Sequence, residues 1–278
     1  MKKASLLSFL FVCLSLSGWA QKGLIKGFDF DKFNVLDKEA EWLCKYDRVA
    51  WITSDSVMTE PDSVLKSLGT MWFVVPGKEN IWWWAFYGRM DGGVFTEVLS
   101  YYVDTSGTIH KNISLPYDKT LNQSLATAIS NAMARMVESQ PASYQKIRHN
   151  QYVRVLADNT IQVWILPAYQ PTSVAVYGGD YTAIYSADGT KRVSESYNFL
   201  EEPMGFKTSP SGRTITVQYP QLKTPPLCAI FFARYYAPYF KNIYLECDNS
   251  NSMLVTEKDG SYWVHAAKEP EKKKKNKK

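Results

Sequence analysis

The sequence lacks the short motifs that usually identify an enzyme. It has no HExxH pair, no GxSxG nucleophile turn and no GxGxxG or Walker-type phosphate loop. Its three histidines, His110, His149 and His265, are far apart and in none of the spacings that paired metal ligands adopt. We therefore expect no metal site and no cofactor, and the sequence assigns no catalytic residue.

The body of the chain also lacks an excess of basic charge. The formal net charge is +5, but residues 268–278 hold seven Lys and two Glu, and the first twenty residues add two Lys. Residues 21–267 carry 23 basic and 25 acidic side chains, a net charge of −2. A nucleic-acid-binding face needs a basic surface, so we expect no nucleic-acid partner. The Lys-rich tail, 268–278, has a composition typical of disorder.

Long hydrophobic runs are missing except near the N-terminus. Residues 1–20 begin with Met-Lys-Lys, continue with an apolar run from Leu6 to Leu16, and end in small residues before Gln21. This is the pattern of a signal peptide, and the run is too short to cross a hydrocarbon core of about 30 Å. We expect export to the periplasm or the medium, and no transmembrane span in the mature chain.

Cysteines are few, and none lies in a CxxC pair. The expected mature chain keeps Cys44, Cys228 and Cys247. An oxidising compartment permits one disulfide with one thiol left over, and the pairing stays open. Cys228 lies in an apolar run and is expected to be buried, whereas Cys247 is the most exposed candidate. A structural role is expected for all three.

Strand-forming runs separated by Gly, Pro and Asp turns fill most of the chain, in which 14% of the residues are aromatic. One long amphipathic helix is expected over residues 121–137, with Leu125 and Ile129 on its apolar stripe and a capping box formed by Thr120 and Gln123. The expected fold class is α+β, with antiparallel β-rich sheets and this helix packed against them.

Three further elements are expected from local pattern. Apolar residues at helical spacing predict a short helix over residues 36–46, and a strand follows over 49–52. The apolar, aromatic run over 227–236 also predicts a strand.

We expect one domain over residues 21–267. Residues 101–111 resemble residues 184–191, which permits two related β-rich halves, 21–140 and 141–267. Two unrelated hairpins with similar Asp-containing turns explain the same likeness, and both explanations stay open.

Four residues are candidates for ligand binding. Trp83 lies in the run Trp82-Trp83-Trp84, where one strand face could bind a sugar or peptide on flat rings, although a sheet covered on both faces explains the same residues. Arg234 and Tyr236 lie among aromatic residues, where the guanidinium could bind a carboxylate or form a structural ion pair. Asp180 follows two glycines and could act in a site or in a turn.

The strings Val-Trp-Ile-Leu-Pro at 163–167, Gly-Gly-Asp-Tyr at 178–181 and Ser-Ala-Asp-Gly at 186–189 resemble exported bacterial proteins of uncharacterised function. The leader ending Trp19-Ala20-Gln21 is similar to those of Bacteroidota. The resemblance implies an envelope or secreted location, and it brings no activity and no site residues.

These features favour a non-enzymatic exported protein that binds a peptide, a glycan or an envelope protein. The alternative is an envelope hydrolase whose site is assembled from distant residues, for which Asp180, His149, His265 and Glu202 are the titratable candidates. A structural subunit of an envelope assembly is a third possibility.

Overall fold

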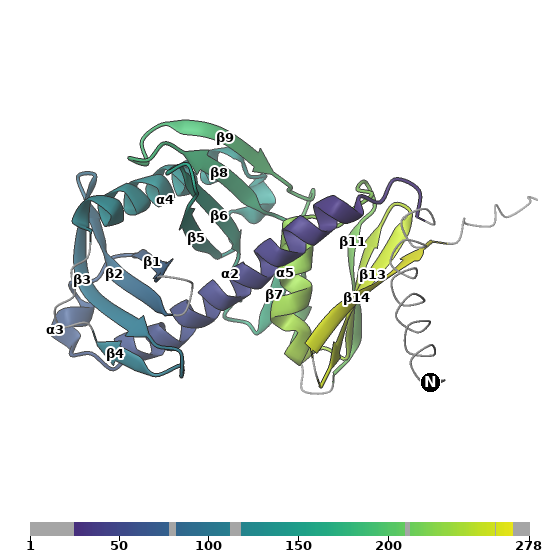
Figure 1. Ribbon diagram of the computed structural model, residues 1–278, viewed down its shortest axis with the longest axis horizontal. Helices are drawn as coiled ribbons and strands as arrows, with labels where there is room; N and C mark the ends of the chain where they lie inside the picture. The colour runs from purple at the N-terminus through teal and green to yellow at the C-terminus, as the bar shows by residue number, and fades with distance from the viewer. Residues whose placement is uncertain (1–24, 78–81, 112–117, 209–211, 259, 269–278) are drawn as a thin grey trace, which may run out of the picture. The chain divides into compact units, whose positions relative to one another are not determined.

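The computed structural model describes residues 25–77, 82–111, 118–208, 212–258 and 260–268 (Figure 1). The expected signal peptide lies outside these ranges, as does the expected tail except for Lys268. Contacts divide the chain into two compact units. Unit 1 combines Met1–Glu39 with Thr208–Lys278, and unit 2 is Ala40–Lys207.

The fold class is α+β. Unit 2 contains one arrangement twice, a helix followed by a four-stranded antiparallel sheet in the order of the chain (Figure 1). The first sheet consists of β1 (Met71–Pro76), β2 (Trp83–Asp91), β3 (Val94–Val103) and β4 (Ile109–Lys111). The second consists of β5 (His149–Val155), β6 (Ile161–Pro167), β8 (Tyr181–Tyr185) and β9 (Arg192–Tyr197). In the sequence, α4 (Lys119–Ser139) and the short η3 (Ala142–Tyr144) lie between the two sheets. β7 (Val174–Tyr177) follows β6 in the sequence but pairs with β10 (Met204–Lys207) in a separate two-stranded sheet.

The two similar sequence segments occupy equivalent places in this arrangement. Residues 101–111 form the hairpin between the third and fourth strands of the first sheet, and 184–191 form the corresponding hairpin of the second. In both turns an aspartate accepts several local hydrogen bonds: Asp104 Oδ1 binds the amides of residues 106 and 108, and Asp188 Oδ1 binds the amide of residue 190. Both four-stranded sheets lie within unit 2. The 140/141 position, where the two expected halves would meet, also lies inside unit 2.

The expected long helix is present as α4, and it covers one face of both sheets. Leu125 and Ile129 are buried in a cluster with Phe86 of β2 and Val163 of β6. The helix begins two residues earlier than the expected capping box, because Asp118 is the N-cap and accepts hydrogen bonds from the amides of residues 120 and 121. The Gln123 side chain instead binds the backbone of residues 93 and 95 in the β2–β3 hairpin.

A second long helix, α2 (Phe30–Val57), replaces the expected short helix over 36–46 and the expected strand over 49–52. That strand prediction is wrong, because Val49, Ala50 and Thr53 are buried at helical spacing. No Gly or Pro interrupts residues 30–57, and the helix continues through its β-branched residues. Residues 30–39 of α2 belong to unit 1 and residues 40–57 to unit 2. A single turn, α3 (Asp62–Leu65), follows.

Unit 1 contains the other sheet, in the order β11-β12-β13-β14. Its strands are β11 (Thr214–Tyr219), β12 (Asn242–Cys247), β13 (Ser250–Glu257) and β14 (Gly260–Ala267). The strand expected over 227–236 is helix α5 (Leu227–Tyr236), which leads into η4 (Ala237–Tyr239), so that prediction is wrong. β11 and β12 are parallel, and parallel neighbours need a crossover connection, which α5 supplies.

The three cysteines are thiols and form no disulfide with one another. Cys228 is buried as expected, but Cys247 is buried as well, so its expected exposure is wrong. Within the part of the chain that the structure describes, no helix has the length and apolar character needed to cross a membrane.

Candidate functional site

The structure places the four candidate residues in separate environments. Trp83 and Asp180 belong to unit 2, whereas Arg234 and Tyr236 belong to unit 1. Each was proposed from its local sequence, and none of the four is among the described residues that line the cavity of unit 1.

Trp83 is part of the core of unit 2. Its side chain is 7% exposed, and its ring centroid lies 5.7 Å from that of Trp42 and 6.3 Å from that of Tyr46, both on α2. Because alternate residues of β2 face opposite sides of the sheet, Phe86 packs under α4. Helices therefore cover both faces of this strand.

Asp180 is buried at the start of β8. Its backbone exchanges two hydrogen bonds with that of Asn198, at 3.0 and 3.3 Å, and the Asn198 side-chain amide donates to Asp180 Oδ2 at 3.3 Å. The preceding Gly178 has a φ of 113°, and its carbonyl accepts a hydrogen bond from the Tyr144 hydroxyl. These contacts order the loop that leads into β8.

Arg234 forms a two-pronged ion pair with Asp37. Its Nε and Nη2 lie 2.6 and 2.8 Å from the two carboxylate oxygens, and Trp263 Nε1 donates to Asp37 Oδ1 at 2.7 Å. Tyr236 is buried two residues further along α5, with its ring 4.8 Å from that of Phe232. All of these residues belong to unit 1, and the ion pair joins the first part of α2 to α5.

The described residues of unit 1 form a cavity of about 320 Å³, which we call the α5 cavity. One of its lining residues, Ala233, directly precedes Arg234 in the sequence. It lies where α5 and η4 meet the first residues of β12 and the last of β13. The side chains that line it are mostly apolar, with three polar ones, and they belong to Ala233, Ala237, Phe240, Lys241, Asn242, Ile243, Met253, Leu254, Val255 and Thr256.

The chemistry of this lining is limited. Among the described residues that form it there is no His, Cys, Asp or Glu, and its polar side chains are those of Lys241, Asn242 and Thr256. Polar atoms form more of its exposed wall than apolar ones. Its seven apolar side chains could contact an aliphatic or aromatic group, and the exposed Lys241 could pair with an anionic group beside it.

A serine and a histidine meet elsewhere in unit 1. Ser252 Oγ lies 2.8 Å from His265 Nδ1, and burial lowers the pKa of that imidazole to about 4. Ser252 is 0% exposed, and the ring of His265 packs against Phe28, Phe30 and Phe33. A substrate has no access to this hydroxyl, so the pair is suited to holding β13 and β14 under the N-terminal segment of α2.

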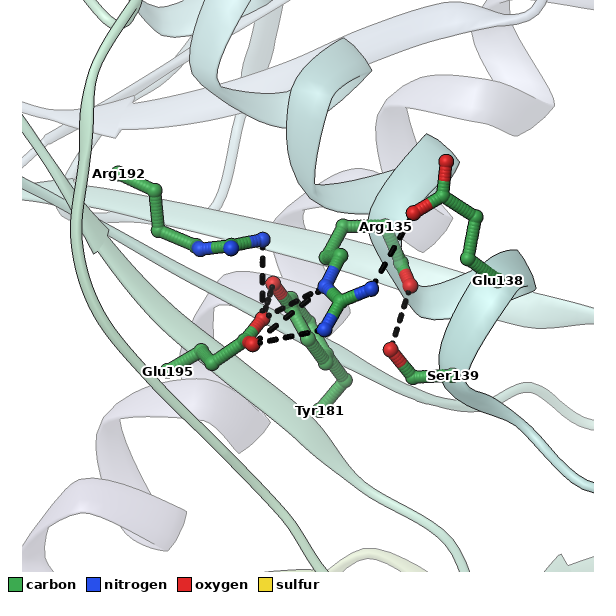
Figure 2. A network of polar contacts seen from close by, with 6 residues as sticks. All are labelled: Arg135, Glu138, Ser139, Tyr181, Arg192 and Glu195. Atoms are coloured by element: carbon green, nitrogen blue, oxygen red, sulfur yellow. Dashed lines mark hydrogen bonds and ion pairs between the residues drawn. The ribbon is translucent and has the colours of Figure 1, made fainter.

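Figure 2 shows a polar network of unit 2, in which Glu195 of β9 contacts Arg135, Tyr181 and Arg192. Arg135 of α4 binds it through Nε and Nη2, the Tyr181 hydroxyl donates to it at 2.9 Å, and Arg192 lies 3.2 Å away. The hydrogen bond from Arg135 lowers the pKa of Glu195, and burial raises the pKa of Tyr181. Every charge in this network is matched, and it fastens α4 to the second sheet.

His149 begins β5, and burial lowers the pKa of its imidazole to about 4. Its Nε2 is buried without a hydrogen-bond partner. Glu202 is exposed in the loop before β10. Within the described ranges, no three His, Cys, Asp or Glu side chains come together as a potential metal site.

Comparisons with protein-family models, with curated proteins and with solved structures find no match to this chain. Sequence reasoning missed the cavity because it assigned 227–236 to a strand, although Pro225-Pro226 directly before that run is a signal for a helix start.

Proposed function

We propose that this protein is an exported, non-enzymatic binding module of the cell envelope or the secreted fraction. The observation that carries the proposal is the α5 cavity, whose described lining has seven apolar side chains, three polar ones and no His, Cys, Asp or Glu. Export is supported by the sequence of residues 1–20 alone.

We further propose that the ligand is a peptide or a protein segment with an apolar side chain that enters the α5 cavity. A glycan needs several converging hydrogen-bond partners, whereas the polar side chains of this lining are those of Lys241, Asn242 and Thr256. A carboxylate on the ligand near the entering side chain would pair with Lys241.

The test is thermal unfolding of the purified chain against hydrophobic peptides with and without a terminal carboxylate, cell-wall oligosaccharides, and divalent metals with chelator. A ligand that binds only the folded state raises stability by about 2.7 kcal/mol at 100 times its Kd, which is several degrees. We expect a shift with peptides and a larger one with the carboxylate. A shift with oligosaccharides alone, or a fall with chelator, contradicts the proposal.

One observation favours the alternative, an envelope hydrolase: the contact between Ser252 and His265. Catalysis requires the hydroxyl to reach a substrate carbonyl, and this hydroxyl is buried under β14 and the start of α2. Esterase and peptidase assays of the native chain and of Ser252→Ala separate the two readings. Activity that Ser252→Ala abolishes while the variant stays folded would establish the hydrolase.

A further inference from the structure

The strands β12 and β13 of the unit 1 sheet pair over only part of their length. Their antiparallel pairing ends where Tyr244 lies opposite Met253. β13 nevertheless continues to Glu257, paired with β14 on its other side, and β12 begins at Asn242, paired with β11. The two strands therefore diverge beyond the Tyr244–Met253 pair, while each keeps its other neighbour.

The α5 cavity lies in this divergence. Its described lining includes three consecutive residues at the start of β12, 241–243, and four consecutive residues of β13, 253–256. Side chains alternate between the two faces of a strand, so a cavity over one face would contact every second residue. Contact with consecutive residues of both strands places the cavity against their facing edges. Ala233 of α5 and Ala237 of η4 add lining from the helix-covered face of the sheet.

The main chain of β13 directs hydrogen-bonding groups into this cavity. Alternate residues of an antiparallel strand direct their amide and carbonyl to opposite neighbours. The Lys268 amide donates to the Asn249 carbonyl at 2.9 Å, in the same register as the β13–β14 pairs, so the odd-numbered residues of β13 bond to β14. The even-numbered Leu254 and Thr256 therefore face the β12 side, and among the described residues neither has a backbone partner there.

The character of the cavity wall agrees with this placement. Seven of its ten described lining residues have apolar side chains, and yet polar atoms form more of the exposed wall than apolar ones. Main-chain groups along a strand edge account for this excess, because every strand residue contributes an amide and a carbonyl whatever its side chain.

We propose that the α5 cavity binds an extended segment of another polypeptide as a short added strand, which pairs with β13 at Leu254 and Thr256. This inference rests on the proposed peptide-binding function and specifies how the peptide is held. Every second residue of a strand repeats at about 7 Å, and an extended polypeptide presents its own amides and carbonyls at that spacing. Addition of a peptide strand to a sheet is a common mode of peptide recognition.

This pairing also selects the side chains of the ligand. Leu254 shares a face of the sheet with Ser252, which is fully buried. The ligand residue opposite Leu254 therefore points to the helix-covered face, where the short side chains of Ala233 and Ala237 leave room for an apolar group. Its neighbours in the ligand point to the other face. We expect a ligand in which apolar residues alternate with polar ones.

Amide hydrogen exchange, followed residue by residue by NMR, tests the pairing on the purified chain. The probe is the acetylated pentapeptide Val-Thr-Leu-Thr-Val with a free carboxylate. In the absence of peptide, we expect fast exchange at Leu254 and Thr256 and slow exchange at Met253 and Val255, which bond to β14. Saturating peptide should slow Leu254 and Thr256 at least tenfold more than Met253 and Val255.

The matched control is the same pentapeptide with N-methyl groups on its three inner amides. It keeps every side chain and loses those donors, so its affinity should fall at least tenfold. Equal affinity of the two peptides overturns the strand pairing, as does slow exchange at Leu254 and Thr256 before peptide is added.

The outcomes separate this inference from the proposed function. A pentapeptide that stabilises the chain in thermal unfolding without selective protection of Leu254 and Thr256 overturns the strand pairing and leaves peptide binding in place. If neither this peptide nor any other stabilises the chain, the proposed function fails and the strand pairing fails with it.

Discussion

The guanidinium of Arg234 donates two hydrogen bonds, of 2.6 and 2.8 Å, to the two carboxylate oxygens of Asp37, while the indole of Trp263 donates a third to the same carboxylate. These three side chains come from α5, α2 and β14, which are distant in the sequence. Both carboxylate oxygens are thus bound within unit 1, which makes Arg234 a structural residue in this account.

The first prediction follows from that ion pair. Arg234→Ala leaves the mostly buried Asp37 carboxylate without its cation, and we expect the free energy of unfolding to fall by about 3 kcal/mol. The double variant Arg234→Leu with Asp37→Leu should recover much of this loss, since no unpaired charge remains. Chemical denaturation measures both. A stable Arg234→Ala variant that has lost peptide binding would instead make Arg234 a ligand-binding residue.

The second prediction concerns acid. Burial holds the pKa of His149 near 4 in the folded chain, against about 6.5 when unfolded. The unfolded state therefore binds a proton first, so stability is unaffected above pH 6.5 and falls between pH 6.5 and 4, by about 3 kcal/mol for this residue. His265 adds a loss of the same sign.

His149→Gln removes one titrating group, and denaturation curves from pH 7 to pH 4 should show a shallower fall for this variant. The control is His110→Gln, because His110 is half-exposed on the β3–β4 hairpin and binds Asp104 at 2.8 Å. An unchanged pH slope in His149→Gln would contradict the assignment.

The third prediction uses the two equivalent hairpins. Gly189 has a φ of 75°, and a Cβ there would lie 2.2 Å from the Ser124 carbonyl oxygen on α4. Gly107 has a φ of 82° with nothing within 4 Å of such a Cβ. Gly107→Ala should cost about 1 kcal/mol from backbone strain, and Gly189→Ala clearly more, because α4 or the turn must shift. Equal costs in thermal unfolding would contradict the packing of this turn on α4.

The fourth prediction addresses the network of Figure 2. Glu195→Gln removes the charge that Arg135 and Arg192 share, whereas Tyr181→Phe removes one hydroxyl and keeps the ring. We expect each change to cost about 1 kcal/mol, since the network is partly exposed. A double-mutant cycle of Tyr181→Phe with Glu195→Ala, which removes both carboxylate oxygens, should show coupling between the two residues. Simple additivity in that cycle would mean that their hydrogen bond contributes nothing measurable.

How far the sequence predicts this molecule depends on the kind of element. The α4 helix was predictable because Leu125 and Ile129 recur on one stripe, and the α+β class followed from that stripe and the strand runs. The hydrophobic pattern of α5 did not reveal a helix, because Leu227–Tyr236 is apolar on nearly every side, and a buried helix then has the same pattern as a buried strand. Only the preceding Pro225-Pro226 indicates a helix start.

The α5 cavity shows the same limit. Its lining joins Ala233 and Ala237 of one element to Met253 and Val255 of another, and no local spacing reports that these segments meet. Trp83 and Arg234 stand out in the sequence for their chemistry, but tertiary contacts with Trp42 and Asp37 occupy them.

The most direct test of the proposed function fills the cavity. Ala237→Leu adds an aliphatic side chain to the lining, and Ala157→Leu adds the same side chain at an exposed turn in unit 2. Peptide binding is measured by thermal unfolding for the native chain and both variants. The account predicts that Ala237→Leu abolishes the stabilisation by hydrophobic peptides while Ala157→Leu retains it. Equal stabilisation of all three proteins would contradict binding at the α5 cavity.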